Sequence, residues 1–131
     1  MPEITFEWDN PEQTVIIAQY PKGWTWDDYH RVIDRVADAL IAHDEPVSFI
    51  NVYAPGAVHP GSAPITHYRR TLRTVKVAYF AYITTDALVI ATLKAFVKLM
   101  DLPQGDRWDI FATVEEGRQF IHARMKQGST D

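Results

Sequence analysis

The stretch that decides the fold is a strand followed directly by a helix: VAYFAYIT at Val77–Thr84, then TDALVIATLKAFVKLM at Thr85–Met100. The strand is apolar on both faces, which is typical of a central strand in a parallel sheet. The helix is apolar nearly all round, which indicates that it is buried. A strand that feeds a buried helix is the repeating unit of an α/β fold, so this stretch predicts that class.

The same alternation of strand and helix extends from this stretch toward both ends of the chain. Two strands come first, at Ile4–Trp8 and Thr14–Tyr20, and their short connection indicates an antiparallel hairpin. The order ββαβαβαβα predicts a mixed, mostly parallel five-stranded sheet with helices packed on it and right-handed crossovers. The other predicted elements are a helix from Thr25 to about His43, a strand at Val47–Tyr53, a short basic helix at Pro64–Arg73, a strand at Trp108–Thr113 and a helix from Val114 to about Lys126.

Length and composition indicate one domain over residues 1–127, followed by a frayed tail at 128–131. The chain has no cysteine, so it offers no disulfide framework, thiol nucleophile or thiolate zinc site. Its N-terminus lacks the basic and apolar regions of a signal peptide. The stretch between Lys76 and Lys94 is too short, and with Asp86 too polar, for a membrane span. We therefore expect a cytoplasmic protein with no membrane span.

Charge is distributed unevenly along the chain, whose net charge is −4. Residues 1–46 carry ten acids and three bases, and residues 86–131 carry seven acids and six bases. Residues 47–85 carry four bases and no acid at all. An acid-free middle in an acidic protein points to a local anionic partner. Nucleic acid is not the partner we expect, because the whole chain is acidic and the basic region lacks an aromatic stacking platform beyond Tyr68.

The helix that follows the first two strands begins with the motif Trp24-Thr25-Trp26-Asp27-Asp28. Together with the element order, this motif resembles the STAS superfamily of sulfate-transporter and anti-sigma-factor-antagonist domains. The closest likeness is to an uncharacterised bacterial branch of STAS-like proteins. The resemblance implies an anti-sigma-factor-antagonist-like fold, no enzymatic activity and no cofactor. It also implies a regulatory role through protein–protein interaction or self-association as a homodimer.

The chain departs from the antagonist branch at the residue that is phosphorylated there. In that branch, a serine in an Asp-Ser-x-Gly type sequence begins the helix after the third strand. Here that motif is absent, and only Ser62 lies just before the corresponding helix. Helix capping is the simpler role for Ser62, and a kinase-controlled switch is not expected. The same architecture also resembles the CRAL-TRIO type of lipid-binding domain, which leaves open a small apolar or lipid-like ligand with an anionic head group.

The basic helix carries the candidate binding residues. Arginine forks and backbone amides at a helix N-terminus suit an anion. The alternative is a solvated helix whose arginines pair with Asp27, Asp34 or Asp38 of the first helix. The candidate anion- or ligand-binding residues are Ser62, His67, Arg69, Arg70 and Arg73.

The histidines do not predict a metal site or a catalytic centre. His30 and Asp34 lie four residues apart on one helix face, but no third ligand stands at a recognised spacing. A surface hydrogen bond between His30 and Asp34 is the simpler expectation. Ser62 could meet His59 or His67, yet there is no nucleophile elbow and no orienting carboxylate in the acid-free segment. We expect neither a metal nor catalytic residues.

The apolar helix at Thr85–Met100 has more apolar surface than one sheet face can cover. It forms plain core, a dimer interface or the wall of an apolar pocket, and Val89, Leu93 and Phe96 are the candidate interface residues. Trp26 begins the apolar face of the first helix, so we expect it to anchor that helix in the core. Most of the other aromatic residues are also expected in the core.

Overall fold

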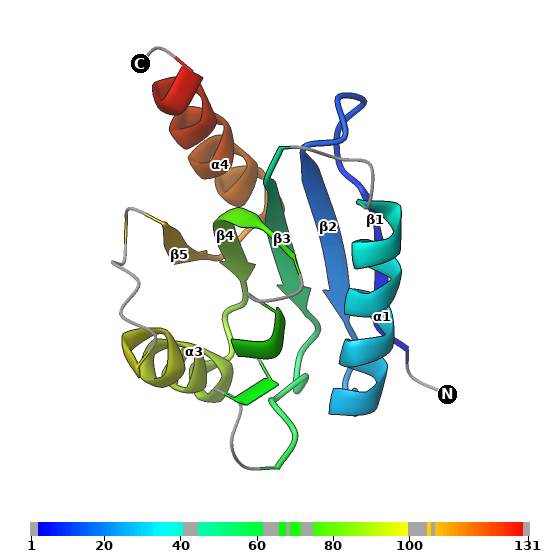
Figure 1. The fold of residues 1–131 in the computed structure, drawn as a ribbon. Helices are drawn as coiled ribbons and strands as arrows, with labels where there is room; N and C mark the ends of the chain where they lie inside the picture. The colour runs from blue at the N-terminus through cyan, green and yellow to red at the C-terminus, as the bar shows by residue number, and fades with distance from the viewer. Residues whose placement is uncertain are drawn as a thin grey trace.

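The fold is a single five-stranded sheet covered by helices on both faces. The computed structural model describes residues 3–40, 45–61, 66–67, 69–71, 75–99, 105 and 107–129. The strand order is β1-β2-β3-β4-β5, with β1 antiparallel to β2 and every other neighbouring pair parallel (Figure 1). These findings confirm the predicted α/β class, the mixed sheet and the antiparallel first strand. The strands are β1 (Thr5–Trp8), β2 (Val15–Tyr20), β3 (Val47–Tyr53), β4 (Val77–Ile83) and β5 (Trp108–Phe111).

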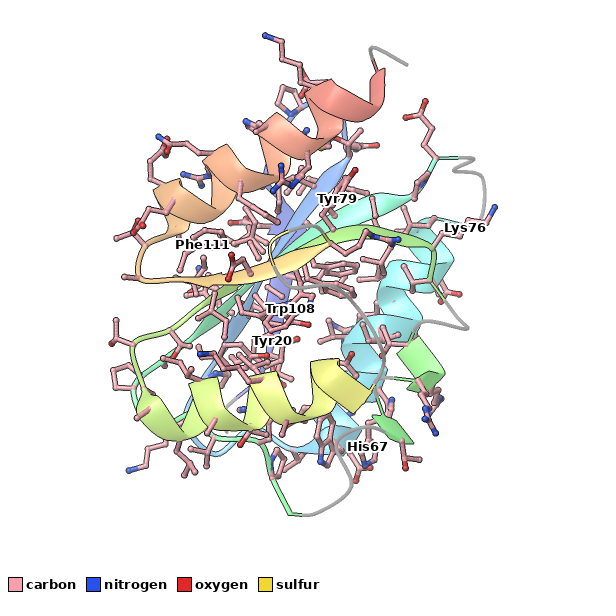
Figure 2. All side chains as sticks on the ribbon, turned by 90° about the vertical axis from the view of Figure 1, so that its left-hand side faces the viewer. Tyr20, His67, Lys76, Tyr79, Trp108 and Phe111 are labelled. Atoms are coloured by element: carbon pink, nitrogen blue, oxygen red, sulfur yellow. The ribbon has the colours of Figure 1, made fainter. Side chains whose placement is uncertain are left out.

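The helices divide between the two faces of the sheet. α1 (Trp26–Ala39) and α3 (Ala87–Leu99) lie on one face, and α4 (Val114–Ser129) lies on the other (Figures 1 and 2). Sequential parallel strands joined by crossovers of one hand place the connecting helices on the same side, as seen for α1 and α3. Residues 66–67 and 69–71 are also helical, and we call them the basic segment. Among the described residues, no helix has the length and apolar character that crossing a membrane requires.

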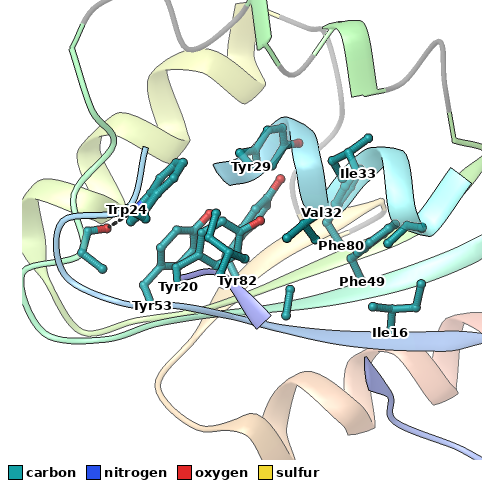
Figure 3. Close-up of a cluster of buried hydrophobic side chains, with 14 of the residues drawn as sticks. Ile16, Tyr20, Trp24, Tyr29, Val32, Ile33, Phe49, Tyr53, Phe80 and Tyr82 are labelled. Atoms are coloured by element: carbon teal, nitrogen blue, oxygen red, sulfur yellow. Dashed lines mark hydrogen bonds between the residues drawn. The ribbon is translucent and has the colours of Figure 1, made fainter. Parts of the chain in front are cut away.

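The two faces of the sheet have different cores because side chains alternate along each strand. On the α1 and α3 face, large rings fill the space, and Tyr20 and Trp108 point to this side (Figure 2). Tyr20, Trp24, Tyr29, Tyr53 and Tyr82 gather there beneath α1 (Figure 3). On the α4 face the core is mostly aliphatic, with Tyr79 and Phe111 packed against it. The aromatic layer lies toward the ends of the strands where a binding site is expected.

Three helix boundaries differ from the sequence expectation. α3 begins at Ala87, two residues after the predicted start at Thr85. α1 ends at Ala39 with Leu40 as its C-cap, before the predicted end near His43, and residues 41–44 lie outside the described part. α4 continues through Ser129, past the predicted end near Lys126. The start of α1 is as predicted, because the Thr25 hydroxyl oxygen accepts from the Asp28 amide at 3.2 Å. Termini of helices depend on capping contacts that periodicity does not encode.

Gly117 lets α4 approach the sheet closely. A Cβ added there would lie 2.7 Å from Ile83 Cδ1 and 3.2 Å from Ala81 Cβ, both on β4. We expect Gly117→Val to lower the free energy of unfolding by about 2–3 kcal/mol, because the extra carbons overpack the aliphatic core. Gln119→Val, at an exposed position of the same helix, should cost no more than about 0.5 kcal/mol. Urea denaturation of both variants tests this, and equal losses would show that α4 can shift outward freely.

Candidate functional site

The candidate site lies at the edge of the sheet where the four parallel strands end, which we call the carboxyl edge. β2, β3 and β4 end there at Tyr20, Tyr53 and Ile83. The segment after β3, residues 54–61, is the edge loop. Ligands and partners of parallel sheets are usually bound at this edge, outside the carboxyl ends of the strands. The basic segment and the N-terminal turns of α1 and α3 lie at the same edge (Figure 1).

Trp24 holds the edge loop against the core. Its side chain is only 1% exposed, and its indole Nε1 donates to the Ala57 carbonyl oxygen at 3.2 Å (Figure 3). The ring packs edge-on against Tyr20, with centroids 5.1 Å apart. Tyr20 in turn stacks on Tyr53 at 4.6 Å, because the two residues are register partners on β2 and β3. A rigid aromatic layer therefore supports the edge loop.

Trp26 is half-buried and joins three segments, so it is not the core anchor that the sequence predicts. Its Nε1 donates to the Pro60 carbonyl oxygen at 2.7 Å. Its ring stacks flat on His67 of the basic segment, with centroids 4.2 Å apart and an interplanar angle of 8°. Side chains in a helix lean toward its N-terminus. Because Trp26 is the first residue of α1, its ring reaches past the helix to the neighbouring loops. The buried face of α1 is formed by Tyr29, Val32, Ile33 and Val36.

His30 and His67 form a hydrogen-bonded imidazole pair. His30 Nε2 and His67 Nδ1 are 2.7 Å apart. In the described part of the chain, the other ring nitrogen of His30 is buried and has no hydrogen-bond partner. The predicted hydrogen bond between His30 and Asp34 is therefore wrong: the ring turns toward the basic segment instead. Burial lowers the pKa of His30, and the positive charge of Arg70 and the neighbouring His67 lower it further.

Two more contacts tie the basic segment to α1. The hydroxyl groups of Tyr29 and Thr71 are 2.6 Å apart and both are buried. Arg70 Nη2 lies 3.8 Å from Asp34 Oδ1, with more than half of each side chain exposed. A pair this open contributes little to stability. It matches the alternative in which the arginines pair with the acids of the first helix.

The predicted anion-binding residues are only partly described. Arg69 and Arg70 are exposed, and His67 is half-buried against Trp26. Ser62 and Arg73 lie outside the described residues. The structure therefore brings His67 and Arg70 against α1 and leaves Arg69 facing solvent. In the described part of the chain, no group of three or more acidic or histidine side chains could hold a metal ion.

A small cavity with a mixed lining lies between α1 and the sheet. Its volume is about 10 Å³, and its lining includes Tyr20, Tyr29, Asn51 and Thr71. The Tyr20 hydroxyl donates to Asn51 Oδ1 at 3.1 Å. Burial raises the pKa of both Tyr20 and Tyr29, so the two hydroxyls stay protonated. Space of this size holds about one water molecule, and it does not fit an apolar ligand.

His59 of the edge loop is enclosed by rings. The centroids of Trp24, Tyr53 and Trp26 lie 5.5, 5.6 and 6.1 Å from its own. This burial lowers the pKa of His59 from 6.5 to about 4, because a low-polarity surrounding disfavours the charged ring. His59 is therefore neutral at physiological pH. It contributes packing to the edge loop, not charge.

The candidate interface residues of α3 are placed in the core. Val89 and Leu93 are 0% exposed and belong to the aromatic core of the single chain. The side chain of Phe96 lies outside the described part. The sheet-facing side chains of α3 pack against the layer of large rings. They are therefore already covered within the single chain, without a second subunit. Val89 and Leu93 are therefore not available for an interface, and among the described residues of α3 it would have to use a different side chain.

Leu88 is the large apolar side chain that the described part of α3 leaves exposed, and the sequence did not single it out. Leu88 is 61% exposed in the first turn of α3, and Val58 of the edge loop is 36% exposed. Asp86 links their two segments: its carboxylate accepts from the amides of Leu88 at 2.9 Å and Gly56 at 3.3 Å. The available signal was weak, because in a helix that is apolar all round the exposed position cannot be told from its neighbours.

Comparison of the chain with protein-family models, with curated proteins and with solved structures gave no match. What the molecule does must therefore be inferred from the carboxyl edge itself.

Proposed function

We propose that this chain is a non-enzymatic, STAS-like regulatory domain that binds a protein at its carboxyl edge, either a partner or a second copy of itself. The element order of the sheet and helices supports the STAS-like assignment. So does the start of α1, where Thr25 caps the Trp24–Asp28 motif. The observation that carries the proposal is the pair of exposed apolar side chains at the edge, Val58 and Leu88.

Val58 and Leu88 are not scattered surface residues. They are the large apolar side chains that the described part of the chain leaves exposed. Val58 follows Gly56 by two residues, and Leu88 follows Asp86 by two residues. The Gly56 amide donates a hydrogen bond to the Asp86 carboxylate, so the two segments are joined. Isolated exposed apolar residues need no explanation, whereas apolar groups gathered on one rigid edge mark a contact site. Leu88 is the better anchor because it is the more exposed.

Charged groups of both signs lie near this apolar pair, because the carboxylate of Asp86 joins the two segments and basic side chains flank them. The Lys22 side chain passes over Gly56, where an added Cβ would lie 3.3 Å from Lys22 Cδ. Lys22 is exposed, as are Arg69 and Arg70 of the basic segment at the same edge. Charges around a contact site mainly set its specificity and association rate. The partner surface that fits is an apolar side chain flanked by charged residues, with acids opposite Lys22 and Arg69.

The alternative, an internal apolar or lipid-like ligand, is less well supported. Such a ligand needs several hundred Å³ of largely apolar space. The cavity between α1 and the sheet has about 10 Å³. A second depression, of about 270 Å³, lies beside the end of β2, but it is open to solvent and its lining includes the polar side chains of Glu3, Thr5 and Gln19. A surface contact fits the described residues better.

Site-specific cross-linking tests the proposal, and the chain suits it because it has no cysteine. Leu88→Cys, labelled with a benzophenone maleimide, places one probe at the edge. Gln119→Cys places the same probe at an exposed position of α4, on the other face of the sheet. After irradiation in an extract of the host cells, we expect a discrete adduct from position 88 that position 119 does not give. Its mass shows whether the captured protein is a second copy or a different chain.

A competition variant completes this test. The probe is attached to Thr85→Cys, close to Leu88. Its adduct is measured in two proteins, one with Leu88 and one with Leu88→Glu. We expect the charged side chain to reduce the adduct at least about tenfold, because it places a carboxylate in an apolar contact. The same adducts from positions 88 and 119, or no effect of Leu88→Glu, would contradict the proposal.

A further inference from the structure

We propose that His30 and His67 form an acid-sensitive latch that holds the basic segment and the edge loop against α1, and that opens when both rings become protonated. The consequence for partner binding rests on the proposed function, whereas the latch itself does not. The proposal starts from the hydrogen bond between the two rings and from the contacts that surround it.

The hydrogen bond allows only certain protonation states. Across 2.7 Å, one ring nitrogen must carry the hydrogen and the other must accept it. With both rings neutral, or with only one positively charged, this requirement is met. When both are charged, His30 Nε2 and His67 Nδ1 each carry a hydrogen, and two like charges face each other. The contact must then open.

The latch opens only on the second proton. His67 lies flat on the indole of Trp26, with ring centroids 4.2 Å apart, and its Nδ1 faces His30. A charged His67 can still donate through Nδ1 to a neutral His30. The first proton therefore leaves the latch closed, and the second proton, on His30, opens it.

The charges around His30 make that second proton unfavourable while the latch is closed. Arg70 of the basic segment and His67 itself disfavour a charged His30, whereas Asp34 and Asp27 of α1 favour it. Burial is the largest of these influences and also disfavours the charged ring, so the pKa of His30 is lowered overall. Opening removes both the burial and the facing ring, so an open His30 binds its proton more tightly. Proton uptake and opening are thus coupled.

The latch holds more than two side chains. Through Trp26, the stack on His67 is continuous with the hydrogen bond to the Pro60 carbonyl oxygen in the edge loop. Tyr29 and Thr71 close the far end of the basic segment by their 2.6 Å contact. Val58 stands two residues before Pro60. If the carboxyl edge binds a partner as proposed, acidification would loosen one of its two apolar contacts.

Amide hydrogen exchange of the purified protein, corrected for the intrinsic effect of pH, tests the latch. We expect the opening equilibrium at Thr71 to rise about fivefold between pH 6.5 and 5.5, since one proton is taken up on opening by a ring whose pKa is about 6.5 when it is free. The matched control is the double variant His30→Gln/His67→Asn, whose amides can form a similar hydrogen bond and do not titrate. It should show no such rise. Equal pH dependence of the two proteins, or none in the wild type, would overturn the latch.

Two further measurements separate the possible outcomes. NMR titration of the wild-type rings does not depend on the variant folding. A pKa of His30 below its ordinary value, with loss of the ring contact when His30 is protonated, supports the latch, and a pKa of His30 near the ordinary value overturns it. Cross-linking from position 88 at pH 7.5 and 5.5 then tests the regulation. If the latch opens at pH 5.5 but cross-linking is unchanged, the latch exists and does not regulate partner binding. If cross-linking occurs and no latch is detected, the latch is contradicted and the proposed function is not.

Discussion

Trp24→Ala is expected to lower the free energy of unfolding by about 3–5 kcal/mol, and Trp26→Ala by only about 1–2 kcal/mol. The two residues are almost adjacent and chemically identical, so the difference comes from their positions. Trp24 is 1% exposed, packs edge-on against Tyr20 and fixes Ala57 by a hydrogen bond. Its removal leaves a large cavity and an unsatisfied carbonyl group. Trp26 is half-buried, so its removal leaves a surface depression that water can fill.

Urea denaturation of the two variants, followed by circular dichroism, measures both losses. The m-value should stay near that of the wild type, because neither change alters the surface exposed on unfolding by much. Equal losses for the two variants would show that both rings are core residues. A larger loss for Trp26→Ala would restore the sequence-based expectation that Trp26 anchors the first helix in the core.

The strands and their order could be predicted because they depend on local patterns. β3 begins and ends at Val47 and Tyr53, as the run of apolar residues predicts, and β4 differs from prediction by one residue at its end. Both are central strands, and their two buried faces exclude charge. The absence of acids from residues 47–85 is therefore due in part to burial. It is not by itself a sign of an anionic partner.

The contacts at the carboxyl edge could not be predicted because they join residues far apart in sequence. His30 meets His67 across 37 positions, and Trp26 meets Pro60 across 34. On the opposite face, Arg118 of α4 makes a two-point hydrogen bond to Asp9 in the β1–β2 turn, across 109 positions. Helical spacing correctly placed His30 and Asp34 on one face of α1. It could not show that a nearer acceptor would come from another segment.

Acidification is expected to destabilise the protein through His59, apart from any effect of the latch. The pKa of His59 is about 4 in the folded protein, because the ring is buried, and near 6.5 when the chain is unfolded. The unfolded chain therefore binds more protons between these values. The stability contributed by the buried neutral ring is fully present above pH 6.5 and is lost as the pH falls toward 4. The total loss is about 3 kcal/mol.

The variant His59→Gln isolates this effect, because glutamine is similar in size and does not titrate. We expect the difference in unfolding free energy between wild type and variant to shift by about 2 kcal/mol in favour of the variant between pH 7 and pH 5. All other titratable groups are the same in both proteins, so their contributions cancel from the comparison. Urea denaturation at half-unit pH steps gives the two curves. Parallel curves would show that His59 is already accessible to protons in the folded state, and that the edge loop is not held closed over the aromatic layer.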